Sequence, residues 1–160
     1  MIRVQNFFQP LAERLPETFA ILCSANLTIH ENVSRIVLHG SRGLKNCFRS
    51  NSDIDLTLIA DLPTGADINL LNDIFQITMS EWKSQVPLDL AVVFEVKNCG
   101  LRCFEHNEWN DEICPIGGMD CFGLYKIGKG FDGLVRDGGV QVRLMYPCLK
   151  IWEKVGQHEY

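Results

Sequence analysis

The stretch VLHGSRGLKNCFRSNSDIDLTLI, residues 37–59, holds the end of one predicted strand, a polar connection and the whole of a second strand. Residues 33–39, VSRIVLH, are rich in β-branched side chains and stop at Gly40, a pattern that predicts a strand. The connection over residues 41–47 fits either a short helix or a turn. Strand, connection and strand together predict a sheet with a polar loop at one edge.

The second strand carries two carboxylates on one face. Residues 53–59, DIDLTLI, alternate, so Asp53, Asp55 and Thr57 share one side and apolar residues take the other. Two carboxylates spaced this way repel each other unless a positive group lies between them. Mg²⁺ prefers oxygen ligands and is commonly held by one or two carboxylates together with substrate phosphates. The pair therefore predicts a magnesium site.

The polar connection is a candidate phosphate-binding segment. If a helix starts after the first strand, its unpaired N–H groups and its dipole favour an anion at that point. Gly40 allows close backbone approach, and the Ser41 hydroxyl can donate to a phosphate oxygen. Asp89, on a third predicted strand over residues 88–96, joins the acidic pair if the strands are neighbours.

Taken in order, these residues resemble the signature of the nucleotidyltransferase superfamily typified by DNA polymerase β, especially its minimal nucleotidyltransferase domains. The signature is a strand ending in an apolar residue and Gly-Ser, then Asp-x-Asp flanked by apolar residues, then a third acid on a later strand. Here eleven residues separate Ser41 from Asp53, and the match covers roughly residues 30–96. The matching residues are Leu38, Gly40, Ser41, Asp53, Asp55 and Asp89.

The resemblance implies a chemistry and a role for each matching position. It implies an α/β (α+β) fold, with a short mixed sheet flanked by helices, and Mg²⁺-dependent transfer of a nucleoside monophosphate from a nucleoside triphosphate to a hydroxyl, with pyrophosphate release. Two metal ions would be held by Asp53, Asp55 and Asp89, which are then also the catalytic residues. Gly40 and Ser41 would contact the triphosphate, and Arg42 fits the Gly-Ser-Arg form of small members. The acceptor, a protein or a small molecule, is not specified by these residues.

Outward from this stretch, apolar periodicity predicts helices and further strands. Residues 16–25 and a segment from Asp67 to before Pro87 have helical spacing, with Pro16 suited to a first turn. Residues 122–127, FGLYKI, fit a short strand, and residues 140–155 recover helical spacing, which predicts a terminal helix interrupted at Pro147.

Length and charge limit the remaining possibilities. The 160 residues predict a single domain over 1–160, with a core at about 16–96 and an irregular C-terminal extension at 97–160. A formal charge of −5 argues against a nucleic-acid partner. The lack of a membrane-length apolar run or a signal-like start predicts no membrane partner and a cytoplasmic location. The C-terminal extension, a second copy in a homodimer or a partner protein could complete the acceptor site.

The seven cysteines include a cluster with ligand types suited to zinc. Its spacing matches no established zinc motif, so reduced thiols are the preferred interpretation. The cluster consists of Cys99, Cys103, His106, Cys114 and Cys121.

Two alternatives to nucleotidyl transfer stay open. One is a non-catalytic binding module with the same fold. The other is a phosphohydrolase, because DIDLT satisfies the Asp-x-Asp-x-Thr pattern of haloacid-dehalogenase-like enzymes. In that family the first Asp closes an apolar strand, whereas Asp53 follows the polar residues FRSNS and opens one.

Overall fold

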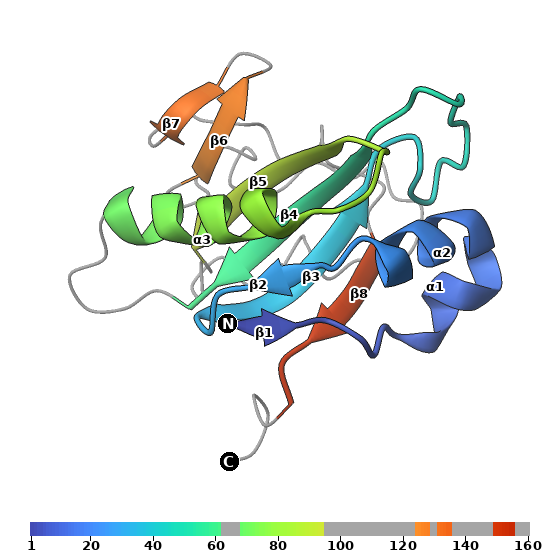
Figure 1. Cartoon of the computed structure of the whole chain (residues 1–160), viewed down its shortest axis with the longest axis horizontal. Helices are drawn as coiled ribbons and strands as arrows, with labels where there is room; N and C mark the ends of the chain where they lie inside the picture. The colour runs from blue at the N-terminus through green and yellow to red at the C-terminus, as the bar shows by residue number, and fades with distance from the viewer. Residues whose placement is uncertain (62–67, 95–123, 129–130, 136–148, 156–160) are drawn as a thin grey trace, which may run out of the picture.

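A mixed sheet forms the centre of the protein, as a computed structural model shows (Figure 1). In the part of the chain that the structure describes, six strands lie in the order β7-β6-β5-β4-β3-β8, and two short strands, β1 and β2, pair separately. The structure describes all residues except 62–67, 95–123, 129–130, 136–148 and 156–160.

The three central strands are those that the sequence predicts. β3 (Val33–His39) pairs antiparallel with β4 (Ile54–Ala60), and β4 pairs parallel with β5 (Leu88–Phe94). A parallel pair needs a crossover, and α3 (Ile68–Glu81) provides it. The predicted mixed sheet with flanking helices is therefore confirmed at the level of a mixed α/β architecture.

Later parts of the chain supply the strands at the sheet edges. β6 (Leu124–Gly128) pairs antiparallel with β5 and with β7 (Phe131–Val135), in line with the strand expected at 122–127. β8 (Leu149–Glu153) pairs antiparallel with β3. The segment predicted as an irregular extension thus contributes strands on both sides of the centre.

The predicted terminal helix over 140–155 is wrong where the structure describes it, because residues 149–153 form β8. The cause is tertiary. The outer edge of β3 needs partners for its backbone N–H and C=O groups, and β8 supplies them with Leu149 and Ile151 buried. Helical spacing of apolar residues is a weaker determinant than this pairing.

The N-terminal segment adds helices and a strand pair. The helix predicted at 16–25 is present as α2 (Pro16–Ser24), preceded by α1 (Gln9–Arg14), which the periodicity does not reveal. β1 (Ile2–Arg3) and β2 (Thr28–Ile29) pair antiparallel. Pro lies in the first turn of both helices, where its missing N–H costs no hydrogen bond.

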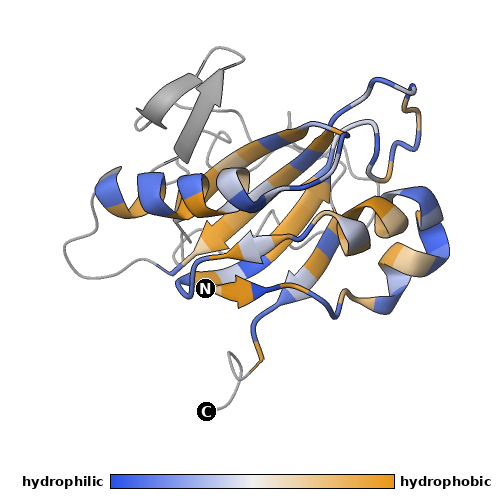
Figure 2. Ribbon diagram, in the orientation of Figure 1, coloured by the Kyte–Doolittle hydropathy of each residue, from blue (hydrophilic) through white to orange (hydrophobic). Residues whose placement is uncertain are grey.

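The helices cover one face of the sheet, where the main core lies (Figure 1). Figure 2 shows α3 with a hydrophobic side toward the sheet and a hydrophilic side away from it. The alternate residues of the strands fill this core, among them Leu38, Leu56 and Leu90. The two-residue period predicted for β4 therefore holds, and it places Asp55 on the face opposite the helices.

That opposite face is also buried over most of its length. Val37, Thr57, Ile59 and Ala91 are all at most 2% exposed, although none belongs to the helix-side core. Along β4, Asp55 is the one residue that is half-buried rather than buried. The sequence predicts a polar face for β4, but the strand is water-accessible only where the acids lie.

In the part of the chain that the structure describes, no helix is long and apolar enough to cross a membrane.

Leu56 provides a test of this core. Its side chain is fully buried on the central strand β4, so Leu56→Ala should lower the free energy of unfolding by about 2–5 kcal/mol, through lost burial and the cavity left behind. Urea unfolding followed by circular dichroism measures the loss. Val155→Ala, at a side chain 94% exposed, is the control and should change stability by less than about 0.5 kcal/mol. Equal effects of the two variants would contradict this account of the core.

Candidate metal and phosphate site

The two neighbouring acids lie where β4 begins. Asp53 directly precedes the strand, and Asp55 is its second residue. Ile54 between them points into the helix-side core and is fully buried. Burial of Ile54 therefore sends both carboxylates to the opposite face, as the alternation predicts.

Asp89 reaches the same place from β5. The parallel register pairs Asp55 with Asp89 and Ile54 with Leu88. The Ile54 amide also donates to the Pro87 carbonyl at 2.9 Å, which fixes the starts of the two strands side by side. The predicted third acid is thus a cross-strand neighbour of the first pair.

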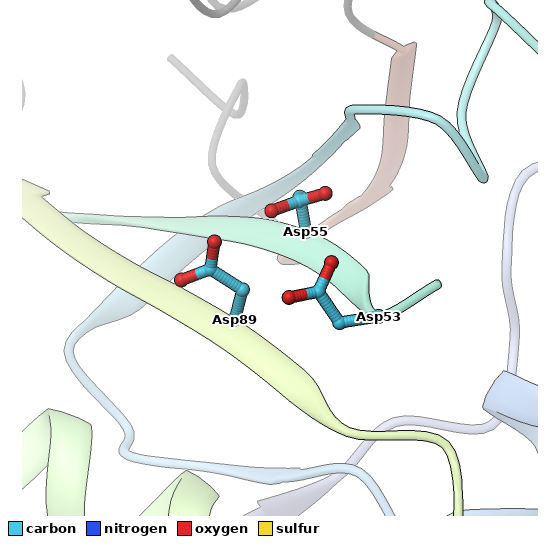
Figure 3. A group of neighbouring side chains, drawn as sticks. All are labelled: Asp53, Asp55 and Asp89. Carbon is cyan, nitrogen blue, oxygen red and sulfur yellow. The ribbon is translucent and has the colours of Figure 1, made fainter. Parts of the chain in front are cut away.

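The three carboxylates form one cluster (Figure 3). One oxygen from each of Asp53, Asp55 and Asp89 lies within 4.8 Å of the others, and all three residues are half-buried. Oxygens on opposite sides of one Mg²⁺ are about 4 Å apart, because each Mg–O distance is about 2.0–2.1 Å. The donor set and its spacing therefore fit a hard divalent cation.

Gly40 lies against the cluster. Its φ of +78° is in the region that glycine adopts without strain. A Cβ at this position would be 2.0 Å from Oδ2 of Asp55 and 2.8 Å from its Cγ. The absent side chain therefore gives the Asp55 carboxylate its space, a role that the sequence pattern alone does not reveal.

The segment after Gly40 is a series of turns rather than a helix. The Gly43 amide donates to the Gly40 carbonyl at 3.0 Å, and the Cys47 amide donates to the Ser41 carbonyl at 3.0 Å. Of the two predicted possibilities, the turn is the one observed, so no helix dipole supports an anion there. Ser41 directly follows Gly40, whose backbone lies against Asp55.

The Arg42 side chain is 96% buried and bonded to main chain. Its Nε donates to the Ser52 carbonyl at 2.8 Å and its Nη2 to the Arg49 carbonyl at 3.3 Å. The guanidinium lies 4.5 Å from the centre of the Phe48 ring. Two of its donors are therefore already used within the loop that leads to Asp53.

His39 and Thr57 lie beside the acids on the same face of the sheet. His39 is the antiparallel partner of Asp55, and a hydrogen bond of 2.9 Å joins its Nε2 to Oγ1 of Thr57. The sequence offers no signal for this bond, because it depends on the register between β3 and β4. The bond fixes the imidazole next to the cluster.

The predicted cysteine and histidine cluster at residues 99–121 lies outside the described residues. Cys23 and Cys47 are described and are exposed free thiols. Partial burial raises the pKa of the Cys23 thiol, which favours its protonated form.

Comparison of the chain with protein-family models, with curated proteins and with solved structures gives no match. The functional conclusion therefore depends on the residues and geometry of the site.

Proposed function

We propose that the protein is an Mg²⁺-dependent nucleotidyltransferase with a DNA polymerase β-like fold. The observation that carries the proposal is the cluster of Asp53, Asp55 and Asp89 beside the Gly40-Ser41 turn. The glycine-serine turn at the end of β3, the two acids at the start of β4 and the third acid on β5 follow the order of the signature that the chain resembles.

The three aspartates would hold the metal. Bound Mg²⁺ would supply Lewis-acid stabilisation of charge on the phosphate oxygens and lower the pKa of the acceptor hydroxyl. The carboxylates come from two strands tied together by the Asp55–Asp89 register, so the protein presents them pre-assembled. A preformed site avoids reorganisation when charge develops, which is the main electrostatic contribution to catalysis.

The turn would bind the nucleotide. Gly40 lets the backbone approach closely, and Ser41 offers a hydroxyl and an amide to the triphosphate. The oxygen of the acceptor hydroxyl attacks the α-phosphorus, the bond from that phosphorus to the β-phosphate oxygen breaks, and pyrophosphate leaves. We assign Asp89 as the carboxylate that accepts the hydroxyl proton. Asp53 and Asp55 would hold the metal, which would supply charge stabilisation to the triphosphate oxygens.

The position of the acids also bears on the phosphohydrolase alternative. All three lie at or just before the start of parallel strands β4 and β5. An aspartyl nucleophile of the haloacid-dehalogenase type would close its strand at the carboxyl end instead. The geometry therefore favours transfer of a nucleotidyl group over phosphoester hydrolysis through an aspartyl-phosphate.

A transfer assay tests the function. The full chain is incubated with α-labelled ATP, CTP, GTP or UTP, Mg²⁺ and a cell extract that supplies acceptors. We expect a labelled acceptor and stoichiometric pyrophosphate with at least one nucleotide, and loss of both with excess EDTA, because the aspartates alone carry like charges toward the triphosphate. A binding module would retain nucleotide without pyrophosphate release. Release of inorganic phosphate from a phosphomonoester would instead support the hydrolase.

A further inference from the structure

We propose that Arg42 is a positioning residue that sets the affinity of the acidic cluster for divalent cations through Asp53, without contacting the nucleotide. The inference rests on the proposed function, because it assumes that the cluster binds metal. It assigns Arg42 a role different from the phosphate contact that the Gly-Ser-Arg resemblance implies.

The hydrogen bonds of Arg42 lead directly to the acid. Its Nε donates at 2.8 Å to the carbonyl of Ser52, the residue before Asp53. Its Nη2 donates to the Arg49 carbonyl at 3.3 Å, and the Arg49 amide donates to Oγ of Ser52 at 2.8 Å. The guanidinium therefore fixes the last turn of the loop immediately before the first metal ligand.

Burial and stacking hold the guanidinium itself in place. Arg42 is 4% exposed and stacks 4.5 Å from the centre of the half-buried Phe48 ring. Its own carbonyl accepts a 2.7 Å bond from Oγ1 of Thr18, a buried residue of α2. Arg42 thus connects a helix packed on the core to the backbone that carries Asp53.

The other two ligands do not depend on this connection. Asp55 and Asp89 lie within β4 and β5 and are held by the strand register. Asp53 precedes β4, so the loop sets its place. Loss of the guanidinium would remove the Arg42 Nε donor from the Ser52 carbonyl, while the Arg49 carbonyl would keep its 3.0 Å bond from the Ser52 amide. The displacement would therefore fall first on Ser52 and Asp53.

The sign of the effect separates positioning from simple electrostatics. Removing a positive charge near three carboxylates makes the local potential more negative, which by itself raises cation affinity. Loss of the correct position of Asp53 lowers the cation affinity. A decrease on neutralising Arg42 therefore cannot come from the charge change alone.

The test measures Mn²⁺ binding by isothermal titration without nucleotide, in the full chain. Arg42→Met should weaken binding about 10-fold to 100-fold, the usual cost of losing a group that orients a metal ligand. Arg42→Lys should not restore the affinity, because a compact ammonium cannot reproduce the fixed spacing of the Nε and Nη2 donors or the planar stack on Phe48. Arg49→Met removes the same charge from the same loop, but the Arg49 side chain is exposed, so its Mn²⁺ affinity should not fall below that of the wild type.

The outcomes separate this inference from the proposed function. A wild-type chain that binds no Mn²⁺ would overturn both. Wild-type binding with undiminished affinity in folded Arg42→Met would overturn the positioning role alone, as would a raised KM for nucleotide that Arg42→Lys corrects. If Arg42→Met fails to fold by circular dichroism, Phe48→Leu replaces it: a smaller loss of Mn²⁺ affinity supports the proposal, and unchanged affinity overturns it.

Discussion

Gly40→Ala is expected to reduce the proposed nucleotidyl transfer by about 100-fold or more. The new methyl group would lie 2.0 Å from Oδ2 of Asp55, so either the carboxylate or the turn must move. A shift of about 1 Å in a reacting group is enough for a loss of this size. The φ of +78° at Gly40 adds backbone strain in any L-residue. Initial rates of pyrophosphate release measure the loss of transfer. Mn²⁺ titration measures the effect of a displaced Asp55 carboxylate on metal affinity.

Gly43→Ala is the control for crowding in the same turn. The nearest neighbours of a Cβ there would be backbone atoms of His39 at 3.0–3.1 Å, whereas those of a Cβ at Gly40 are side-chain atoms of Asp55. Its cost should therefore appear in thermal stability more than in Mn²⁺ affinity. If Gly40→Ala kept full activity and metal affinity, the close packing of Gly40 against Asp55 would not matter to function.

Asp55→Asn is expected to lower transfer by about 1,000-fold or more while leaving the fold intact. A metal contributes several kcal/mol to the transition state, and each 1.4 kcal/mol is a factor of ten in rate. In metal-free buffer the variant should melt at a higher temperature than the wild type, because the substitution removes one of three mutually repelling carboxylates.

With added Mg²⁺, the wild type should instead melt at a higher temperature than Asp55→Asn. Bound metal stabilises the wild type by about 2.7 kcal/mol at 100 times its Kd, but a variant with an incomplete site gains less. Asp73→Asn, on the exposed side of α3, removes the same charge away from the cluster and should behave as wild type. Equal Mg²⁺ stabilisation of Asp55→Asn and the wild type would contradict the assignment of the metal site.

Local pattern was sufficient to predict the centre of the sheet and the meeting of the three acids. Alternation in residues 53–59 places Asp53 and Asp55 on one face, and strand order makes Asp89 a neighbour. Both inferences need only a two-residue period and the tendency of successive strands to pair. The phosphate roles of Gly40 and Ser41 remain predictions.

Features that depend on distant contacts were not predictable in the same way. β8 forms because its backbone pairs with the outer edge of β3. The apolar spacing of residues 140–155, which include β8, suggested a helix instead. The packing of Gly40 on Asp55 depends on the path of the backbone at the end of β3. The positioning role proposed for Arg42 depends on its bond to the Ser52 carbonyl, whereas the motif alone suggested a phosphate ligand.

The pairing of β8 with β3 also has a consequence for how the protein is made. Val37 and Lys150 are partners in the sheet, yet more than 100 residues separate them in the sequence. A ribosome adding roughly 5–20 residues per second needs on the order of ten seconds to pass from one to the other. Throughout that interval the edge of β3 has no β8 to cover it, and open strand edges promote aggregation. The nascent chain is therefore expected to be most prone to aggregation after β3 has been synthesised and before β8 pairs with it.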